Sequence, residues 1–316
     1  MDNEIYAAVD IGGTKIAYGI FDREHRLIAK RKKPTDLAAI GPEFFQTVIE
    51  NIENLLLEKG YEMNTLSGIG IGMPGMITPE GQVALIAMLP KLQGFDAGGY
   101  FRKLLPDKRV RLANDSHCAA LAEYRYGAGR GHRHMLYCPV STGLASGIII
   151  DGKLFTGSNG AAGESGHTIV SPEGGIACGC GNVGCVCSYA SGSLIIRHIQ
   201  NWIAAGQPTV MTALAGSAEA ITPHHISEAF RAGDRMAERA LDQMGFYLGL
   251  WVFNLYLTLN IDCFVFGGGL INLGDMLFDR VKKTFYEHCF TNFPVTFNFA
   301  ELGQDSGLLG ALELLF

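Results

Sequence analysis

The chain opens with Tyr6-Ala-Ala-Val-Asp-Ile-Gly-Gly-Thr-Lys-Ile-Ala-Tyr-Gly-Ile-Phe21, and this stretch decides the fold. Two apolar runs flank a turn of two glycines and a threonine, which predicts a strand, a tight turn and a return strand. The same order recurs in Met135–Val140, Ser141-Thr142-Gly143 and Gly147–Ile150. The repeat predicts a duplicated α/β fold with two halves around a cleft.

Glycine is the unusual feature of the composition, with 41 of 316 residues, nearly twice the roughly 7% of an average protein. No Gly-X-Y period accompanies it, which excludes collagen and flexible linkers. The excess points instead to turns with positive φ or to backbone that a ligand approaches closely. The formal net charge is −6, so the chain carries no overall basic footprint for nucleic acid.

The termini and apolar stretches predict a cytoplasmic protein. Met1-Asp2-Asn3-Glu4 has no positively charged region, so we expect no secretory signal peptide. The uncharged stretch 243–261 is almost long enough to cross a membrane, but its polar residues favour a buried helix. Four of the eight cysteines lie between 178 and 187, which favours a metal site over a disulfide framework.

Asp10 and the glycine turn after it predict a phosphate site. Gly12 and Gly13 leave backbone amides uncovered, so these amides and Thr14 could hold a phosphate, with Asp10 placed for a hydrated Mg²⁺. The turn is not a Walker-type loop, because the Gly-Lys-Ser/Thr ending is absent. A simple hairpin is the alternative, but Ser141-Thr142-Gly143 and Gly267-Gly268-Gly269 favour a nucleotide site.

Asn114-Asp115 stands between a predicted strand, Arg109–Ala113, and a predicted helix, Ser116–Tyr126. Helix capping by Asp115 explains the pair without any function. The functional alternative is a general base, because a helix N-terminus favours an ionised carboxylate.

A histidine and a run of cysteines predict a zinc site. His167 ends Gly163-Glu-Ser-Gly-His167, and Cys178-Gly-Cys-Gly-Asn-Val-Gly-Cys185 follows shortly afterwards. One imidazole and three thiolates match a closed structural Zn²⁺ site. Cys187 could instead replace His167 and give a site of four cysteines.

Together these motifs resemble the ROK (repressor, open reading frame, kinase) family of sugar kinases along the whole chain. The resemblance rests on motifs in the family's order: Asp10-Ile-Gly-Gly-Thr-Lys15, Gly70-Ile-Gly-Met-Pro-Gly75, Asn114-Asp115, Ser141-Thr-Gly143, Gly163-Glu-Ser-Gly-His167, Cys178-x-Cys180-Gly-x-x-Gly-Cys185, Gly267-Gly-Gly269 and Ser306-Gly-Leu-Leu-Gly310. It implies an α/β actin-like ATPase fold of two ribonuclease-H-like domains that close on ATP and a sugar, usually as a homodimer. We expect one domain over 1–118, with a C-terminal helix at about 303–316 packing back on it. A second domain over 119–302 would carry a zinc insert at about 164–187.

The resemblance also assigns roles by position. Asp115 would take the proton from the sugar's 6-hydroxyl. Residues expected to bind the sugar are Gly75, Asn114, Asp115, Glu164, His167 and Cys187. Residues expected to hold ATP and Mg²⁺ are Asp10, Gly12, Gly13, Thr14, Lys15, Thr142, Gly143, Gly268 and Gly269. The expected zinc ligands are His167, Cys178, Cys180 and Cys185.

Two departures from the family's pattern concern the substrate. Cys187 stands where the family usually has a sugar-binding glutamate, and Met88 stands where many members have an asparagine. Each lost contact to a hydroxyl could weaken recognition by roughly 1–3 kcal/mol. We therefore expect an ATP-dependent kinase acting on the 6-hydroxyl of a hexose or N-acetylhexosamine, or alternatively a weak or inactive sugar-binding sensor. The family's repressors carry a helix-turn-helix domain before the first turn, and only nine residues precede Asp10, so we expect no DNA binding.

Overall fold

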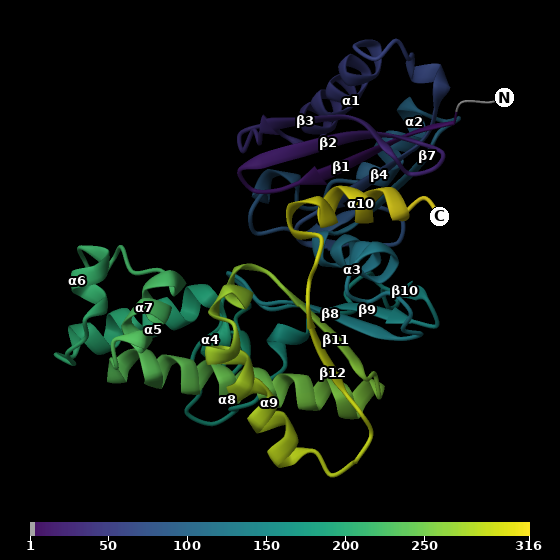
Figure 1. Ribbon diagram of the computed structural model, residues 1–316. Coiled ribbons are helices and arrows are strands. Elements are labelled where there is room, and N and C mark those ends of the chain that lie inside the picture. Colours follow the sequence, from purple (N-terminus) through teal and green to yellow (C-terminus); the bar gives the residue numbers. More distant parts are fainter. Residues whose placement is uncertain (1–3) are drawn as a thin grey trace. The chain divides into compact units, whose positions relative to one another are not determined.

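The computed structural model describes residues 4–316 (Figure 1). Residues 1–3 lie outside this part of the chain, and with them most of the tetrapeptide used for the signal-peptide prediction. The fold divides into two compact units. Unit 1 comprises the residues up to Tyr137 together with Gly147–Ala162 and Ala300–Phe316. Unit 2 comprises Cys138–Ser146 and Gly163–Phe299.

Unit 1 is built on a five-stranded sheet in the order β3-β2-β1-β4-β7. Its strands are β1 (Ile5–Ile11), β2 (Lys15–Asp22), β3 (Leu27–Pro34), β4 (Leu66–Met73) and β7 (Arg109–Asn114). β2 pairs antiparallel with β1 and β3, whereas β4 is parallel to β1 and to β7. The predicted strand, turn and return strand at the N-terminus are therefore present. β1 and β4 are buried along nearly their whole length, as strands covered on both faces must be.

The helices of unit 1 are α1 (Gly41–Leu57), α2 (Ala97–Leu104), α3 (Asp115–Tyr126) and α10 (Ser306–Glu313). Shorter elements are η1 (Met63–Thr65), β5 (Met76–Ile77), β6 (Val83–Leu85), η2 (Pro90–Leu92) and η5 (Gly303–Asp305). α10 packs on β1, β4 and α3. Glycines allow this close approach: a Cβ at Gly70 would lie 1.7 Å from the Ala311 carbonyl oxygen, and one at Gly310 would lie 1.7 Å from that of Cys118.

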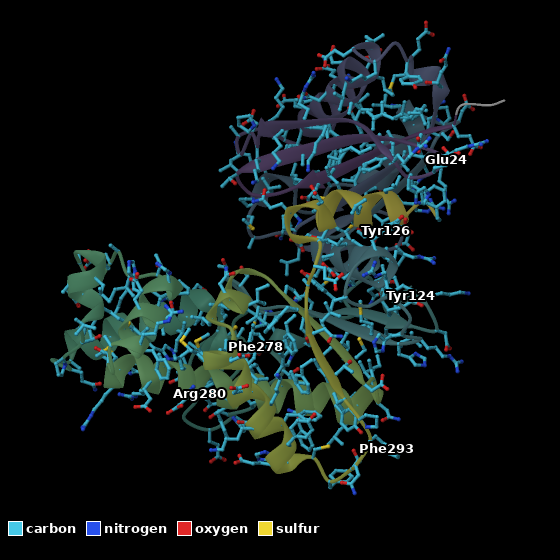
Figure 2. All side chains as sticks on the ribbon, in the orientation of Figure 1. Glu24, Tyr124, Tyr126, Phe278, Arg280 and Phe293 are labelled. Carbon is cyan, nitrogen blue, oxygen red and sulfur yellow. The ribbon has the colours of Figure 1, made fainter. Side chains whose placement is uncertain are left out.

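The contact between α3 and α10 also sets the extent of unit 1, which reaches Tyr137 rather than the expected boundary at 118. Tyr126, labelled in Figure 2, ends α3 and donates a hydrogen bond to the Glu313 carboxylate of α10. Glu123 is fully buried and accepts hydrogen bonds from the amides of Glu301 and Leu302, at 3.2 and 2.9 Å. These bonds tie the C-terminal segment to unit 1.

A second five-stranded sheet has the order β10-β9-β8-β11-β12. Its strands are β8 (Met135–Pro139), β9 (Gly147–Ile150), β10 (Lys153–Phe155), β11 (Cys263–Gly267) and β12 (Thr296–Phe299). β9 is antiparallel to β8 and β10, and β11 is parallel to β12. Asp151 and Gly152, with φ of 52° and 74°, form the tight turn between β9 and β10. The division between the units runs through this sheet, with β9 and β10 in unit 1 and β11 and β12 in unit 2.

The other elements of unit 2 are mainly helical: η3 (Ser165–His167), α4 (Cys187–Ala190), α5 (Gly192–Ala204), α6 (Met211–Ala215), α7 (Pro223–Arg231), α8 (Arg235–Leu259), η4 (Gly269–Leu273) and α9 (Asp275–His288). α8 contains the uncharged stretch predicted as a buried helix, and the Asp234 side chain caps it by accepting from the amides of Met236 and Ala237. Among residues 4–316 no helix is long and apolar enough to cross a membrane.

Candidate active site

The β1–β2 turn holds the first predicted phosphate-binding group. The Gly12 amide donates to the Lys15 carbonyl at 2.9 Å, and the Thr35 hydroxyl donates to the Gly12 carbonyl at 2.7 Å. The amide and the carbonyl of Gly12 are thus both hydrogen-bonded within the protein, contrary to the expectation that the amides of both glycines are uncovered. Gly13 and Thr14 form its tip, and Thr14 and Lys15 are exposed. A phosphate approaching this turn would meet its tip.

Met88 covers part of the same turn. A Cβ at Gly13 would lie 2.3 Å from the Met88 terminal methyl carbon, so the thioether side chain lies directly on the glycine. Met88 is 56% exposed, so its side chain also faces solvent. The sequence singled out Met88 as a change in the sugar pocket, and in unit 1 its side chain contacts the phosphate turn.

Asp10 and Asp115 lie at one edge of the first sheet. Asp10 is paired with Gly72 and Gly72 with Ala113, so the carboxyl ends of β1 and β7 meet at the same edge. Burial, and after it the nearby Asp115 carboxylate, raise the pKa of Asp10 to about 6, while Lys15 opposes the shift. Two carboxylates that repel each other in one electrostatic environment form a site that favours a bound cation.

Asn114, not Asp115, is the N-cap of α3. Its Oδ1 accepts from the Ser116 amide at 2.7 Å, and its Nδ2 donates to the Gly75 carbonyl at 2.8 Å. The capping explanation for Asp115 is therefore wrong: Asp115 is the first helical residue, its Oδ1 lies 2.7 Å from the same amide, and its side chain is exposed. The helix N-terminus favours the ionised carboxylate.

Two glycines position this edge. Gly75 has φ of 94°, and a Cβ there would lie 2.2 Å from the Leu85 carbonyl oxygen, so the turn that presents its own carbonyl to Asn114 requires glycine. Gly307 of α10 packs on Asp10, because a Cβ at Gly307 would lie 2.4 Å from the Asp10 carboxyl carbon. The C-terminal motif thereby contributes to the burial of Asp10.

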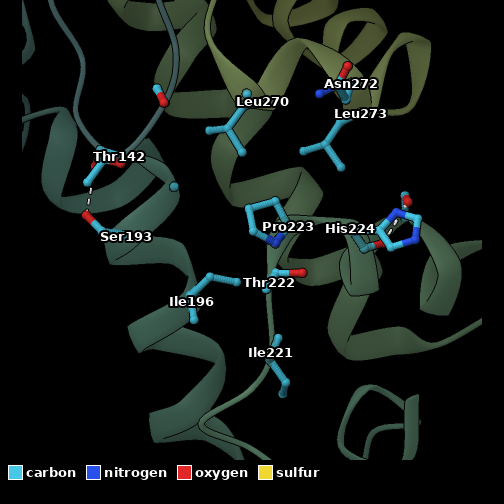
Figure 3. Close-up of a pocket in the computed structure, with 14 residues that line it drawn as sticks. Thr142, Ser193, Ile196, Ile221, Thr222, Pro223, His224, Leu270, Asn272 and Leu273 are labelled. Carbon is cyan, nitrogen blue, oxygen red and sulfur yellow. Dashed lines mark hydrogen bonds between the residues drawn. The ribbon is translucent and has the colours of Figure 1, made fainter. Parts of the chain in front are cut away.

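Unit 2 contains a cavity of about 670 Å³. Ser141 and Thr142 line one part of it and Gly269 another, while the apolar walls are Ile196, Ile221, Pro223, Leu270 and Leu273 (Figure 3). Ser193 donates to the Thr142 carbonyl at 2.7 Å and so fixes the turn after β8. Polar side chains also line the cavity on more than one side, among them Ser193, His224 and Asn272. A cavity that combines apolar walls with several polar groups is typical of a small-molecule site.

The glycines at this cavity differ in what they do. Gly268 has φ of 84°, and a Cβ there would lie 2.6 Å from the Val140 carbonyl oxygen, so it is required by packing. Gly269 and Gly143 would each point a Cβ into open space. Gly269 thus leaves bare backbone facing the cavity, as a closely bound ligand would need.

A group of residues that could hold a metal ion lies elsewhere in unit 2. Ligand atoms of His167, Cys178, Cys180 and Cys185 all lie within 4.8 Å of one another. His167 Nδ1 is 3.5 Å from Cys178 Sγ, and Cys180 Sγ is 3.7 Å from Cys185 Sγ. A tetrahedral zinc with Zn–S bonds of about 2.3 Å places its sulfurs about 3.8 Å apart, so the donor set and spacing fit zinc.

Hydrogen bonds within the insert hold these ligands in place. The Cys178 amide donates to the Asn182 carbonyl at 2.8 Å, which closes the knuckle between the two cysteine pairs. Gly184, with φ of 82°, lets the chain pass the Ser171 carbonyl before Cys185. Burial raises the pKa of Cys178, but hydrogen bonds, first from the Cys180 amide and then from the Cys187 thiol, outweigh burial and lower it to about 6. These hydrogen bonds favour the thiolate form that a metal ligand needs.

The chain resembles known proteins along nearly its whole length. The model of the ROK family matches residues 6–316. The chain belongs to the ROK family. A glucokinase from Streptomyces coelicolor is 32% identical over 318 residues, covering 97% of this chain and 96% of the relative. An N-acetylgalactosamine kinase from Shewanella is 33% identical over 323 residues, covering 98% and 96%. The solved ROK glucokinase from Streptomyces griseus, in complex with glucose and AMPPNP, has a TM-score of 0.77 at 30% identity and covers 98% of each chain.

Family membership confirms the predicted fold class, an α/β actin-like ATPase fold. Within this ROK chain, unit 1 brings together the phosphate turn, Asp10, Gly75 and the Asn114-Asp115 pair. Unit 2 contains the remaining predicted residues in two groups: Thr142, Gly143, Gly268 and Gly269 lie at or near the cavity, and Glu164, His167, Cys178, Cys180, Cys185 and Cys187 lie at the cysteine cluster.

Glu164 and His167 are neighbours in this ROK chain. His167 Nε2 lies 3.9 Å from a Glu164 carboxylate oxygen, on the side of the ring away from the thiols. The imidazole thus faces a carboxylate with one nitrogen and the cysteines with the other, the arrangement that fixes a metal-bound histidine. The Cys187 thiol lies 3.4 Å from Cys178 Sγ and 3.7 Å from His167 Nδ1, so it belongs to this cluster.

Sequence reasoning missed the apolar walls of the cavity. Ile196 comes from α5, Ile221 and Pro223 from the start of α7, and Leu273 from η4. Thr222 and Pro223 carry a recognisable helix-start signal, and Thr222 and His225 form a capping box. That signal predicts the helix, but nothing local connects the helix to the turn at Thr142.

Proposed function

We propose that this ATP-dependent carbohydrate kinase transfers the γ-phosphoryl group of ATP to the 6-hydroxyl of a hexose or N-acetylhexosamine. Kinases of both kinds of sugar are found among its relatives, and the S. griseus neighbour binds glucose and an ATP analogue. The observation that carries the proposal is the shared sheet edge of Asp10 and Asp115, next to the phosphate turn. It supplies a base, a cation-binding carboxylate and a phosphate-binding turn together.

Asp115 would act as the general base. It is exposed and begins α3, where the positive end of the helix dipole favours a negative charge. A carboxylate placed this way can accept the hydroxyl proton as the oxygen attacks phosphorus, a contribution of roughly 10²–10⁴-fold in rate. Asn114 would hold Asp115 in place, because its side chain accepts from the Ser116 amide at the start of α3 and donates to the Gly75 carbonyl.

Asp10 would hold Mg²⁺, whose preferred ligands are carboxylate and water oxygens. Bound Mg²⁺ supplies charge neutralisation on the phosphates. Asp10 is well suited to this role because burial and Asp115 make its own negative charge unfavourable, so a cation would stabilise it. The tip of the β1–β2 turn, with Gly13 and Thr14, would orient the phosphates.

The cavity of unit 2 would bind the nucleoside part of ATP. Its volume of about 670 Å³ and its walls of Ile196, Pro223 and Leu270 suit a planar apolar base. The bare backbone at Gly269 and the turn at Thr142 and Gly143 would lie along the ribose and phosphates. Phosphoryl transfer depends mainly on such positioning.

Glu164 and His167 would bind sugar hydroxyls, and the zinc ligands would stabilise the segment that carries them. The contact between His167 and Glu164 would link sugar binding to metal binding, since the His167 imidazole faces the Glu164 carboxylate with one nitrogen and the cysteines with the other. The four ligands would be His167, Cys178, Cys180 and Cys185. The homodimer implied by the family resemblance is part of the proposal, and light scattering of the purified protein measures it directly.

One observation favours a second candidate, a sugar-binding protein without turnover. The Met88 side chain lies on Gly13, where an incoming phosphate would meet the turn. A coupled assay of ADP release over a panel of hexoses and N-acetylhexosamines separates the two. A kinase gives sugar-dependent ADP release, whereas a pure binder gives sugar-dependent thermal shifts and no ADP.

A further inference from the structure

The cysteine cluster contains more donors than one zinc ion uses. His167, Cys178, Cys180 and Cys185 form the mutually close set, and zinc in structural sites takes four ligands. Cys187 is a fifth donor at the side of this set, with its sulfur 3.4 Å from Cys178 Sγ. The Cys187 thiol, which a four-coordinate zinc ion would leave unbound, therefore lies in contact with the Cys178 thiol, which belongs to the ligand set.

The two cysteines are held differently. Cys187 is the first residue of α4 and is only 7% exposed. The helix α4 packs against α5 and α8. The neighbouring Val186 donates its amide to the Thr168 carbonyl at 3.0 Å, which fixes the backbone before Cys187. Cys178 is half-buried and lies in a largely exposed knuckle. A disulfide bond of about 2.05 Å would require the two sulfurs to approach by roughly 1.4 Å from their 3.4 Å contact, and the exposed knuckle is the side with less packing to oppose that shift.

The other cysteines offer no comparable surplus pair. Cys180 and Cys185 are 3.7 Å apart, but both belong to the ligand set. Cys118, Cys138 and Cys263 are fully buried in the sheets and helices outside the cluster. Among the described cysteines, Cys178 and Cys187 are thus the pair that joins a metal ligand to a spare thiol.

We propose that Cys178 and Cys187 form a reversible disulfide when the protein is exposed to a hydroperoxide, which makes the cluster a redox-modification site. One thiol attacks the peroxide, the O–O bond breaks, and a sulfenic acid and one water form. The second thiol then attacks that sulfur, the S–S bond forms and a second water leaves. In sum, two thiols lose two electrons and two protons, and hydrogen peroxide is reduced to two waters.

The disulfide would remove one ligand from the proposed metal site. Once Cys178 is bonded to Cys187 it no longer offers a thiolate, and the set is reduced to His167, Cys180 and Cys185. Zinc affinity falls with the loss of one ligand, and the segment carrying Glu164 and His167 loses its support. This consequence rests on the zinc assignment under the proposed function, whereas disulfide formation needs only the two thiols.

The experiment treats the full-length, zinc-loaded protein with hydrogen peroxide. Non-reducing peptide mapping by mass spectrometry identifies cross-links, and a metallochromic indicator follows zinc in solution. We expect a Cys178–Cys187 peptide and release of roughly one zinc per chain, both reversed by dithiothreitol with added zinc. In Cys187→Ser, zinc release should slow by roughly fivefold or more, because oxidation must then consume two ligands. The matched control, Cys289→Ser, removes a half-buried cysteine outside the cluster and should behave as wild type.

Three results would overturn the proposal. They are a peptide map dominated by another cross-link such as Cys180–Cys185, zinc loss from Cys187→Ser at the wild-type rate, and zinc retained by His167→Ala but absent from Cys187→Ser before any peroxide. The last would place Cys187 among the ligands. Should Cys187→Ser fail to fold, the wild-type peptide map decides alone. A protein without zinc would refute the metal assignment, and the map would still decide the disulfide.

Discussion

The negative charge of Asp115 acts on Asp10, from which it is separated by the single strand β4. Burial is the larger cause of the raised Asp10 pKa, and α10 contributes to that burial through Gly307. The chain therefore maintains two carboxylates where one alone would be more stable. Such an arrangement costs stability and is typical of a functional site.

Asp10→Asn should stabilise the protein without metal or nucleotide at high pH. The folded-state pKa is about 6 and the ordinary value is 3.8, so the folded chain binds the proton more tightly than the unfolded chain. The penalty is therefore absent below about pH 4, grows as the pH rises to about 6 and is complete above it. At pH 8 the substitution should add about 3 kcal/mol to the free energy of unfolding.

Urea unfolding of wild type and Asp10→Asn at pH 4 and pH 8 measures this difference. The same variant should lose Mg²⁺-dependent turnover, because an amide is a poor substitute for the carboxylate. Equal stability of the wild type and Asp10→Asn at pH 8 would mean that the ionised Asp10 carboxylate does not destabilise the folded state. Retained Mg²⁺-dependent turnover would remove Asp10 from the proposed metal site.

Gly268 and Gly269 should respond in opposite ways to substitution. Gly269→Val places a side chain in the open space of the cavity, so the KM for ATP should rise at least roughly tenfold with little change in Tm. Gly268→Ala meets the Val140 carbonyl and a positive φ, so it should destabilise the fold by roughly 1–3 kcal/mol. Steady-state kinetics with varied ATP, together with thermal unfolding, measure both. An unchanged KM in Gly269→Val would show that ATP binds elsewhere.

Removal of the metal should destabilise unit 2 selectively. Cys185 is fully buried in the ligand group, so Cys185→Ser should abolish the roughly one zinc per chain and lower the Tm. A strong chelator should do the same to the wild type, and Cys289→Ser serves as the control. Elemental analysis and thermal unfolding measure these effects. Zinc-free wild type with an unchanged Tm would contradict a structural role for the metal.

Asn114→Ala should lose both an N-cap and the bond to Gly75. The cap alone contributes roughly 1 kcal/mol to stability. Asn114→Asp keeps an oxygen that can accept from the Ser116 amide but loses the donor to the Gly75 carbonyl. Chemical unfolding should therefore place Asn114→Asp between the wild type and Asn114→Ala at neutral pH. Equal stability of all three would mean that neither hydrogen bond contributes.

The strands and turns at the N-terminus are predictable from the sequence because their pattern is local. Apolar runs interrupted by glycines specify β1 and β2, whereas the capping role could not be assigned in advance, since Asn114 and Asp115 are equally good N-caps. The extent of unit 1 was also unpredictable. It depends on α10 packing on α3, two elements that are far apart in the chain.

The closeness of His167, Cys178, Cys180 and Cys185 could be predicted because cysteine spacing within a short insert carries its own geometry. The cavity walls could not, because Ile196, Pro223 and Leu273 meet only in the folded chain. The position of Cys187 is similar. The family resemblance implies a place at the sugar, while in the structure its sulfur lies beside Cys178 and His167.

The most direct test of the proposed function is sugar-dependent ADP release by wild type and Asp115→Asn. The panel should contain hexoses and N-acetylhexosamines, with ATP and Mg²⁺ present, and calorimetry should measure sugar and nucleotide binding in parallel. The wild type should turn over at least one sugar. Asp115→Asn should bind both ligands and lose roughly 10²-fold or more in kcat. Wild-type turnover by Asp115→Asn, or no sugar-dependent ADP release by the wild type, would contradict the assignment of Asp115 as the catalytic base of a sugar kinase.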